Sequence, residues 1–213
     1  FSSRNQTSPF VSLILSRLPL DSSLTVLDVG AGPGTLALPI AAKVKSVTAL
    51  DFSSGMLAIL SQQAEKAGID NIRTVHCSWE DDWTAFNIGQ HDIAIASRSL
   101  AVADLRGALR QLDRYASQAI FIVDRISPAP FDPEAFRAVG RPFNPGPDYI
   151  YVLNILYGMG IHPHVHILGL DSTSRFADQD EAFRSYSWMF KDLSAQEESR
   201  LRCHRGPVRR GPW

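Results

Sequence analysis

The sequence predicts an α/β protein built on a doubly wound, mostly parallel, Rossmann-like sheet with helices on both faces. Short apolar runs of strand length alternate five times with stretches of helical spacing. The runs are nearly continuous in apolar residues, which is typical of parallel strands buried on both faces. Right-handed crossovers between such strands place helices on the two sides of the sheet. With 213 residues, 45% of them hydrophobic, the chain is long enough for one soluble domain with a sizeable core.

The predicted elements follow one another closely as far as Asp124. The expected strands are 24–29, 46–50, 72–76, 91–96 and 119–123. The expected helices are 35–43, 54–67 and 101–116, and Gly68 is the residue that should end the second of them. Residues 24–124 therefore form the expected core of a single domain that spans 1–213.

After Asp124 the pattern changes. Six prolines between residues 127 and 148 favour a loop-rich excursion, and we expect residues 127–160, which end in a helix over 149–159, to form an insertion that caps a pocket. Residues 161–213 should supply a sheet edge and helices. The elements expected there are a strand over 164–168, helices over 178–190 and 194–202, and a last strand, if present, in 207–213.

Composition and charge exclude several classes of protein. The two cysteines, Cys77 and Cys203, are far apart and form no CxxC pair, so neither a disulfide scaffold nor a structural zinc site is predicted, and a reducing, cytoplasmic setting is the default. No apolar run approaches the length of a membrane span. The 21 basic and 22 acidic residues nearly balance, which disfavours a general phosphate-binding surface, although five arginines and no acid follow residue 199.

The most informative segment is VLDVGAGPGT, residues 26–35. Its glycines alternate in the turn that should open the first helix, at the carboxyl end of the first strand, where open α/β sheets bind ligands. Glycines let a backbone approach a ligand closely and allow positive φ. Asp51 stands at the end of the second strand, where a carboxylate can accept hydrogen bonds from both hydroxyls of a ribose.

The spacing of the glycines separates two nucleotide-binding families. A nicotinamide-binding fingerprint requires G-x-G-x-x-G, whereas here the third position after Gly32 is Thr35 and a glycine comes one residue early. An acid two residues before G-x-G-x-G resembles the first motif of class I S-adenosylmethionine-dependent methyltransferases. The segment ALDFSSGML, residues 49–57, is similar to the second motif of that family. The resemblance covers residues 24–124.

The resemblance implies a role for each motif position. S-adenosylmethionine would be the methyl-donating cofactor and S-adenosylhomocysteine the product. Asp28 would lie near the amino group of the cofactor, directly or through water, and Asp51 would bind its ribose. The turn residues that would lie against the methionine and ribose portions are Gly30, Ala31, Gly32 and Gly34.

Three further segments carry implied contacts. Phe52 and Met56 would touch the adenine face, although core packing explains an apolar side chain equally well. The loop after the third strand would meet the adenine edge through Ser78, Trp79 or Glu80, where the family often has an acid. Ser97, Arg98 and Ser99 would face the methionine end and the acceptor. Arg98 departs from the Asn or aromatic residue that the family often has there, and could pair with a carboxylate of cofactor or substrate.

No catalytic residue follows from the family, because the sulfonium is already an activated donor and the protein has mainly to orient the acceptor. Weak candidates come from residues 161–168, IHPHVHIL, where His162, His164 and His166 would share one face of a strand, and from Tyr151 in the preceding helix. The three histidines could hold a metal, but no acid or cysteine lies at ligand spacing, so no metal site is predicted.

A small-molecule acceptor is the function that these patterns favour. Nucleic-acid base methylation is disfavoured because the stretch after the fourth strand reads ASRSL rather than Asn/Asp-Pro-Pro-Tyr/Phe, and no Pro-Cys nucleophile is found. Three alternatives stay open: a tRNA or rRNA methyltransferase, a protein methyltransferase, and a binding module without activity. The arginines that would contact RNA phosphates are Arg98, Arg125, Arg137, Arg141 and the C-terminal cluster.

Overall fold

The computed structural model describes residues 8–126, 131–144, 148–169 and 178–204. The chain divides into two compact units. The first contains residues 1–124 and 155–162, and the second contains residues 125–154 and 163–213. Helix α6 (Tyr149–Gly158) crosses the division. The predicted seventh strand, in 207–213, and most of the basic C-terminal run lie outside the described residues.

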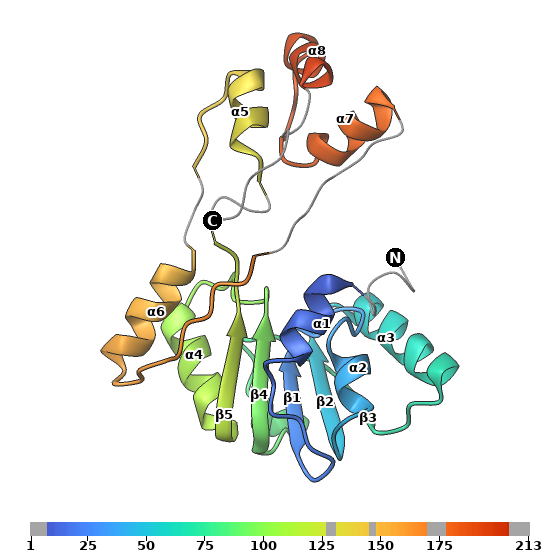
Figure 1. Ribbon diagram of the computed structural model, residues 1–213, viewed down its shortest axis with the longest axis vertical. Coiled ribbons are helices and arrows are strands. Elements are labelled where there is room, and N and C mark those ends of the chain that lie inside the picture. Colours follow the sequence, from blue (N-terminus) through green and yellow to red (C-terminus); the bar gives the residue numbers. More distant parts are fainter. Residues whose placement is uncertain (1–7, 127–130, 145–147, 170–177, 205–213) are drawn as a thin grey trace. The chain divides into compact units, whose positions relative to one another are not determined.

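The first unit is built on a five-stranded, all-parallel sheet, which confirms the predicted fold class. Its strands are β1 (Thr25–Val29), β2 (Ser46–Asp51), β3 (Ile72–His76), β4 (His91–Ser97) and β5 (Ala116–Val123). They pair in the order β3-β2-β1-β4-β5, so the connection between β3 and β4 passes from one edge of the sheet to the other side of β1. All carboxyl ends therefore meet at one edge of the sheet (Figure 1).

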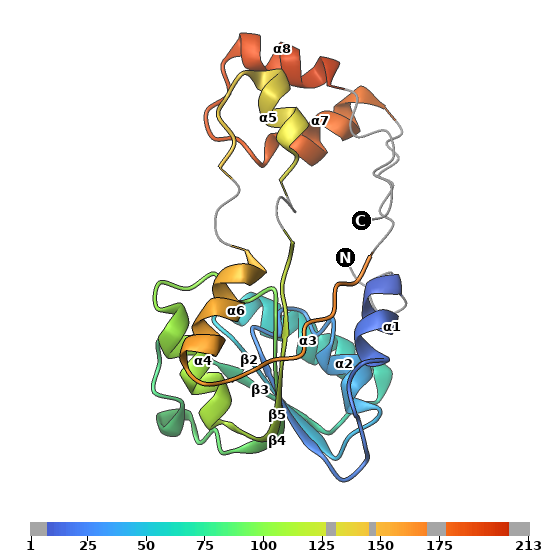
Figure 2. The ribbon, with the colours of Figure 1, turned by 60° about the vertical axis from the view of Figure 1, so that its left-hand side comes forward.

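Helices cover both faces of this sheet. The helices and helical turn of the first unit are α1 (Pro9–Leu15), α2 (Ala37–Ala41), α3 (Ser54–Ala67), the 3₁₀ turn η1 (Trp83–Phe86) and α4 (Leu105–Arg114). Figure 2 shows the sheet nearly edge-on, with α2 and α3 on one side and α4 on the other. Because the sheet is covered on two sides, β1 and β4 are buried along almost their whole length.

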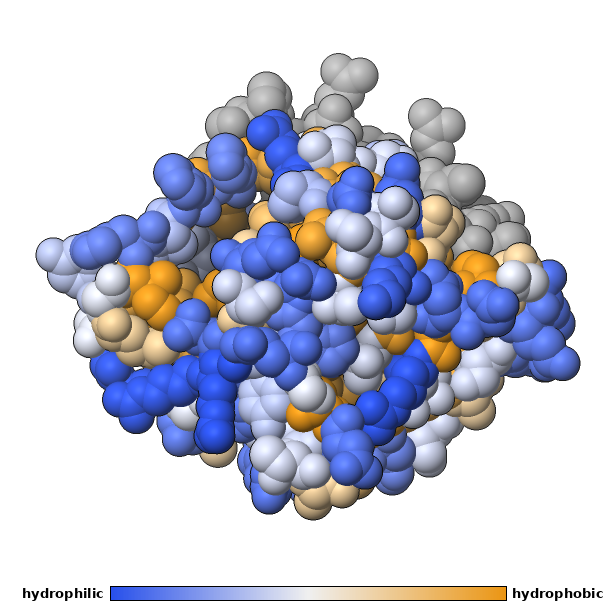
Figure 3. Space-filling view, turned by 90° about the horizontal axis from the view of Figure 1, so that it is seen from below, coloured by the Kyte–Doolittle hydropathy of each residue, from blue (hydrophilic) through white to orange (hydrophobic). Residues whose placement is uncertain are grey.

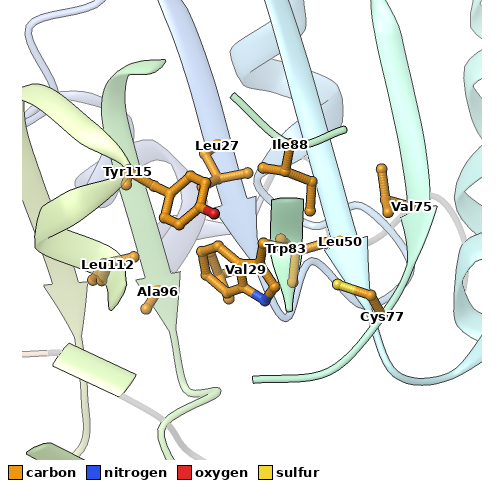
Figure 4. Packing of buried hydrophobic residues seen from close by; sticks show 11 residues of the cluster. Leu27, Val29, Leu50, Val75, Cys77, Trp83, Ile88, Ala96, Leu112 and Tyr115 are labelled. Atoms are coloured by element: carbon orange, nitrogen blue, oxygen red, sulfur yellow. The ribbon is translucent and has the colours of Figure 1, made fainter. Parts of the chain in front are cut away.

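A tryptophan from η1 lies at the centre of the core on the α4 side. Trp83 is 1% exposed, and its indole Nε1 donates a hydrogen bond of 2.9 Å to the carbonyl oxygen of Ser78. Its ring centroid is 5.0 Å from that of Tyr115 and 5.6 Å from that of Trp79. Strands β1, β2 and β4 supply the aliphatic side of the cluster (Figure 4). The polar end of Trp83 is thus satisfied while its ring fills the core.

The second unit contains three short helices around a small core of its own. They are α5 (Pro133–Val139), α7 (Gln179–Ser187) and α8 (Ala195–Cys203). The buried residues they share are Ala135, Val139, Tyr186, Phe190 and Leu201. Arg141 pairs with Glu197 at 2.7 Å, and Glu197 also accepts from the backbone and hydroxyl of Ser194. The hydrogen bond from Arg141 is the main cause that lowers the pKa of Glu197 to about 2.

The sequence prediction was wrong in three places. Residues 161–169 form no strand, so the strand predicted over 164–168 does not exist, and Val165 and Ile167 are 50% and 63% exposed. The excursion predicted as loop-rich contains helix α5, and α1 was not predicted at all. Both missed helices start with a capping residue followed by proline, Ser8-Pro9 and Asp132-Pro133. Proline in the first helical turn loses no hydrogen bond, so it begins a helix there rather than breaking one.

None of the helices in the described residues is long and apolar enough to cross a membrane. The face seen in Figure 3 is largely hydrophilic, with small, separate hydrophobic spots.

We expect Trp83→Phe to lower the free energy of unfolding by about 2 to 4 kcal/mol, because it leaves a cavity and deprives the Ser78 carbonyl of its donor. Urea titration followed by circular dichroism measures this loss. The same substitution at Trp188, which is 57% exposed, serves as the control and should change stability by less than about 0.5 kcal/mol. A loss at Trp83 no larger than that at Trp188 would contradict the central place of Trp83 in the core.

Candidate functional site

The glycine turn leaves the end of β1 and is tied to the end of β2. The backbone N–H groups of Gly30 and Ala31 donate to the carbonyl oxygen of Leu50 at 2.8 and 3.0 Å. Gly30, Gly32 and Gly34 have φ values of 75°, 56° and 88°. Residues with a side chain rarely adopt these values, so three glycines in alternate positions are what this turn requires.

Asp51 joins this turn to the loop that follows β2. One carboxylate oxygen, Oδ2, accepts from the N–H of Gly32, and the other, Oδ1, accepts from the N–H of Ser53, both at 2.8 Å. The residue is only 6% exposed. Each carboxylate oxygen can accept a second hydrogen bond, so Asp51 keeps acceptor capacity for hydroxyl groups of a ligand.

Asp28 is a buried acid beside the same turn. It is 2% exposed, and its Oδ2 has no hydrogen-bond partner among the described residues. Burial, and to a smaller degree the neighbouring charge of Asp51, raises the pKa of Asp28 to about 7, while a backbone hydrogen bond from Ala37 opposes the rise. A buried carboxylate with an unused oxygen is costly to keep and is well suited to a cationic or hydrogen-bond-donating ligand.

The end of β4 completes the site on its other side. The hydroxyl of Ser99 donates to the Val29 carbonyl at 2.6 Å, and the indole of Trp79 donates to the Ser99 carbonyl at 2.9 Å. A Cβ at Gly30 would lie 2.3 Å from the Cβ of Ser99, so only glycine allows this approach. The turn after β1 and the segment after β4 are therefore packed against each other.

A pocket of about 330 Å³ opens between these two segments. It lies where strand order reverses, between β1 and β4, which is where open α/β sheets bind ligands. It is lined by Phe10, Asp28, Gly30, Ala31, Gly32, Pro33, Thr35, Leu36, Ser97 and Arg98. Six of these are predicted cofactor residues. Phe10 was missed because the start of α1 was not recognised.

The other predicted cofactor residues do not line this pocket. Gly34 faces inward, where a Cβ would meet Leu60 and Leu38 at 2.9 to 3.1 Å, so its absence of a side chain serves helix packing. Phe52 and Met56, beside Asp51, are 76% and 42% exposed, so core packing does not account for them.

The loop after β3 is held mainly by its own hydrogen bonds. Ser78 donates its N–H to Asp81 at 2.7 Å, and its hydroxyl accepts from the N–H of Glu80 at 3.3 Å. Trp79 is half-buried against the core and uses its indole N–H on the Ser99 carbonyl. Contacts from Ser78, Trp79 or Glu80 to an adenine edge stay a prediction.

The catalytic candidates are exposed side chains outside this pocket's lining. His162, in the first unit, touches the ring of Tyr157 edge-on with centroids 5.3 Å apart. Tyr151, His164 and His166 are exposed and belong to the second unit. The one-face arrangement expected of the histidines depended on the strand that is not formed. In the described parts of the chain, no three His, Cys, Asp or Glu side chains are grouped so as to hold a metal ion.

Two curated relatives match the sequence. An uncharacterized protein of Haemophilus influenzae is 33% identical over 197 residues, which is 92% of this chain and 73% of the relative. A probable ribosomal RNA small subunit methyltransferase A of Methanosphaera stadtmanae is 37% identical over 65 residues, or 30% of this chain and 24% of that protein.

Solved structures and a family model agree with the architecture. A SAM-dependent methyltransferase from Aquifex aeolicus superposes with a TM-score of 0.58 at 19% identity, covering 75% of this chain and 83% of that one. A protein of Bacillus halodurans described as a putative methyltransferase gives 0.56 at 17% identity, over 72% and 69% of the two chains. Both likenesses concern the fold. The family model of a methyltransferase domain matches residues 26–119, from β1 into β5.

Residues 26–119 of the chain form a methyltransferase domain of the class I, S-adenosylmethionine-dependent kind. The protein is a methyltransferase, and S-adenosylmethionine is its cofactor. The residues present fit that cofactor: the glycines of the turn present backbone without side chains, and the pocket lining includes Asp28, whose Oδ2 is unpaired among the described residues. The Asp51 carboxylate next to Gly32 provides the acceptor that a ribose needs.

Two alanine substitutions in the glycine turn should differ in their cost. Gly30→Ala should lower the free energy of unfolding by about 2 to 4 kcal/mol, from positive φ together with overlap on Ser99. Gly32→Ala has no atom within 4 Å of its new Cβ, so only the φ penalty of about 1 kcal/mol applies. Urea titration of both variants measures the difference, and equal losses would argue against the close packing of Gly30 on Ser99.

Proposed function

We propose that this enzyme transfers the methyl group of S-adenosylmethionine to a small-molecule acceptor by in-line displacement. The near balance of 21 basic and 22 acidic residues is the observation that supports a small acceptor, and the pocket between β1 and β4 supports the cofactor part of the proposal. Its volume of about 330 Å³ is at the lower end of the usual range for small-ligand sites, about 300 to 1,000 Å³. Its lining combines the apolar Phe10, Pro33 and Leu36 with a few polar groups, which suits a metabolite rather than a polymer.

The cofactor contacts form the second part of the proposal. Each carboxylate oxygen of Asp51 already accepts one hydrogen bond, from the N–H of Gly32 or of Ser53. Each can accept one more, and these two would come from the ribose hydroxyls. Asp28 receives the amino group of the methionine end. The turn from Gly30 to Gly32 would lie against the part of the cofactor that joins the ribose to the amino group. The exposed ring of Phe52, the residue after Asp51, would contact the adenine.

The protein's contribution to the reaction is orientation. The bound cofactor supplies a methyl group that is already activated by its sulfonium. The end of β4, held to β1 through Ser99 and to β5 through the N–H of Arg98, gives a fixed wall against which an acceptor can be aligned. Alignment at contact distance removes much of the entropic barrier to a displacement. Cys77, at the start of the neighbouring loop, is no nucleophile at neutral pH, because burial raises the pKa of its thiol to about 11.

An RNA acceptor is the second candidate, and two observations favour it. The Methanosphaera relative is described as a probable ribosomal RNA methyltransferase, although it matches only 65 residues. Arg106, Arg110 and Arg114 recur every four residues on α4, and all three are exposed. Such a stripe can follow a phosphate backbone. RNA methylation that falls steeply with salt, with no turnover of small molecules, would replace the first proposal by this one.

Isothermal titration calorimetry with S-adenosylmethionine tests the cofactor site. Asp51→Ala should weaken binding by at least tenfold, because the ribose loses its acceptor and the turn loses the carboxylate that holds Gly32. Asp113→Ala, at an exposed acid on α4, is the control and should bind as the wild type does. If the wild type does not bind S-adenosylmethionine, or if Asp51→Ala binds it as tightly as the wild type does, the proposed contact between Asp51 and the ribose is wrong.

Asp28→Asn should show a dependence on pH with a definite sign. The pKa of Asp28 is raised in the folded protein, so the wild type is favoured at low pH and loses stability as pH rises from about 4 through 7. The amide that replaces the carboxyl group does not titrate. The variant should therefore gain about 2 to 4 kcal/mol relative to the wild type between pH 4.5 and 8, with no further gain above that.

Urea titrations at pH 4.5, 6 and 8 measure this difference, with Asp113→Asn as the control that removes an exposed acid. The same Asp28→Asn variant should bind S-adenosylmethionine at least tenfold more weakly at pH 8, because the neutral amide no longer attracts an ammonium group. A stability difference that is flat with pH would show that Asp28 ionises normally in the folded protein.

A further inference from the structure

Arg98 is the cation of the pocket. Among the residues that line it, Asp28 and Arg98 are the two with ionisable side chains, and they carry opposite charges. Asp28 comes from the end of β1, whereas Arg98 follows β4 directly. The pocket therefore offers an acidic wall and a basic wall, provided by adjacent strands.

The backbone of Arg98 is fixed in an uncommon conformation. Its φ is 56°, in the left-handed region that residues with a side chain rarely occupy. Its N–H donates to the Val123 carbonyl at 2.8 Å, and the next residue, Ser99, is tied to β1 and to Trp79. Strain of this kind, which costs on the order of 1 kcal/mol or more, tends to occur where a side chain must be aimed at a ligand.

The guanidinium of Arg98 lies over an aromatic ring, and its N–H donors have no hydrogen-bond partner among the described residues. Its central carbon lies 4.7 Å from the ring centroid of Phe10, which also lines the pocket. Stacking uses the face of the guanidinium and leaves its in-plane N–H groups available. Among the residues that the structure describes, no carboxylate lies within 4 Å of it, whereas Arg137, Arg141 and Arg202 each pair with one.

We propose that Arg98, held against Phe10, binds a carboxylate in this pocket and so determines which molecules the pocket selects. The inference deepens the proposed function and rests on it. A planar fork of N–H donors matches a carboxylate through two parallel hydrogen bonds. A single cation suits a singly charged group better than a phosphate dianion. Two ligands could bring that carboxylate: the amino-acid end of the cofactor, for which Asp28 would take the ammonium, or an acidic acceptor.

The first experimental arm tests the cofactor as the source. Calorimetry compares S-adenosylhomocysteine with 5′-methylthioadenosine, which lacks the amino-acid group, on the wild type, Arg98→Gln and Arg98→Lys. If the cofactor carboxylate binds Arg98, Arg98→Gln weakens S-adenosylhomocysteine at least tenfold and leaves 5′-methylthioadenosine within twofold. Arg98→Lys should give a smaller loss, because it keeps the charge without the fork. Arg17→Gln, at an exposed arginine that does not line the pocket, is the matched control.

The second arm tests the acceptor as the source. Hydroxy-, amino- and mercaptobenzoates and their primary amides are titrated against the protein saturated with S-adenosylhomocysteine. Their turnover with S-adenosylmethionine is measured in parallel. If the acceptor is an acid, the wild type binds benzoates at least tenfold more tightly than the amides. Arg98→Gln then abolishes that preference while its Kd for S-adenosylhomocysteine stays within twofold.

The outcomes separate the inference from the proposed function. The inference is overturned if Arg98→Gln leaves the binding affinities in both arms unchanged. It is also overturned if the variant weakens the binding of each ligand with a carboxylate and of its counterpart without one equally, as a merely structural role of Arg98 would. The first arm and the binding half of the second need no turnover. Methylation of RNA without any small-molecule methylation would overturn the small-acceptor proposal alone, while the binding measurements would still decide whether Arg98 holds a carboxylate.

Discussion

The pair of hydrogen bonds that Asp51 accepts from Gly32 and Ser53 is the constraint on which the rest of the site depends. The bond from Gly32 fixes the glycine turn to the end of β2, and the Leu50 carbonyl, which accepts from Gly30 and Ala31, fixes it at a second point. With the turn held there, Gly30 can lie against Ser99, and the end of β4 is brought to β1. The position of Arg98 follows from that contact. A carboxylate on β2 thus controls the wall contributed by β4, two strands away in the sheet.

The first unit was predictable because its signals are local and strong. Parallel strands buried on both faces are apolar along most of their length, so the central strands β1, β2 and β4 could be recognised as runs, and Gly68 marked the end of α3. The second unit gave weaker signals. The segment around Val165 and Ile167 has the β-branched residues of a strand, yet a strand forms only where a neighbour supplies hydrogen bonds, and sequence pattern contains no information on that neighbour. The prolines before α5 were interpreted as breakers although one of them begins a helix.

The residues of the candidate site also fall into two groups, those that the sequence indicated and those that it did not. The glycines, Asp28 and Asp51 could be identified because their role is steric or electrostatic at a fixed place in a strand-turn-helix unit. Phe10 and the close approach of Ser99 depend on contacts between distant segments, 88 residues apart for Phe10 and Arg98, and no periodicity marks them. Gly34 was expected to lie against the cofactor, whereas in the structure its missing side chain makes room for Leu38 and Leu60. A motif therefore indicates which residues shape the site, but not which atoms each of them contacts.

The buried carboxyl group of Asp28 has one more consequence, which concerns protons. Because burial brings its pKa to about 7, a large fraction of the free protein carries a proton on this group at neutral pH. An ammonium group placed against Asp28 favours the charged carboxylate and expels that proton into solution. Cofactor binding and proton release are then a single coupled equilibrium, and the heat measured on binding includes the ionisation enthalpy of whichever buffer takes the proton up. In the binding mode that we propose, the affinity of the enzyme for its methyl donor is linked to the pH of the solution through a side chain that solvent hardly reaches.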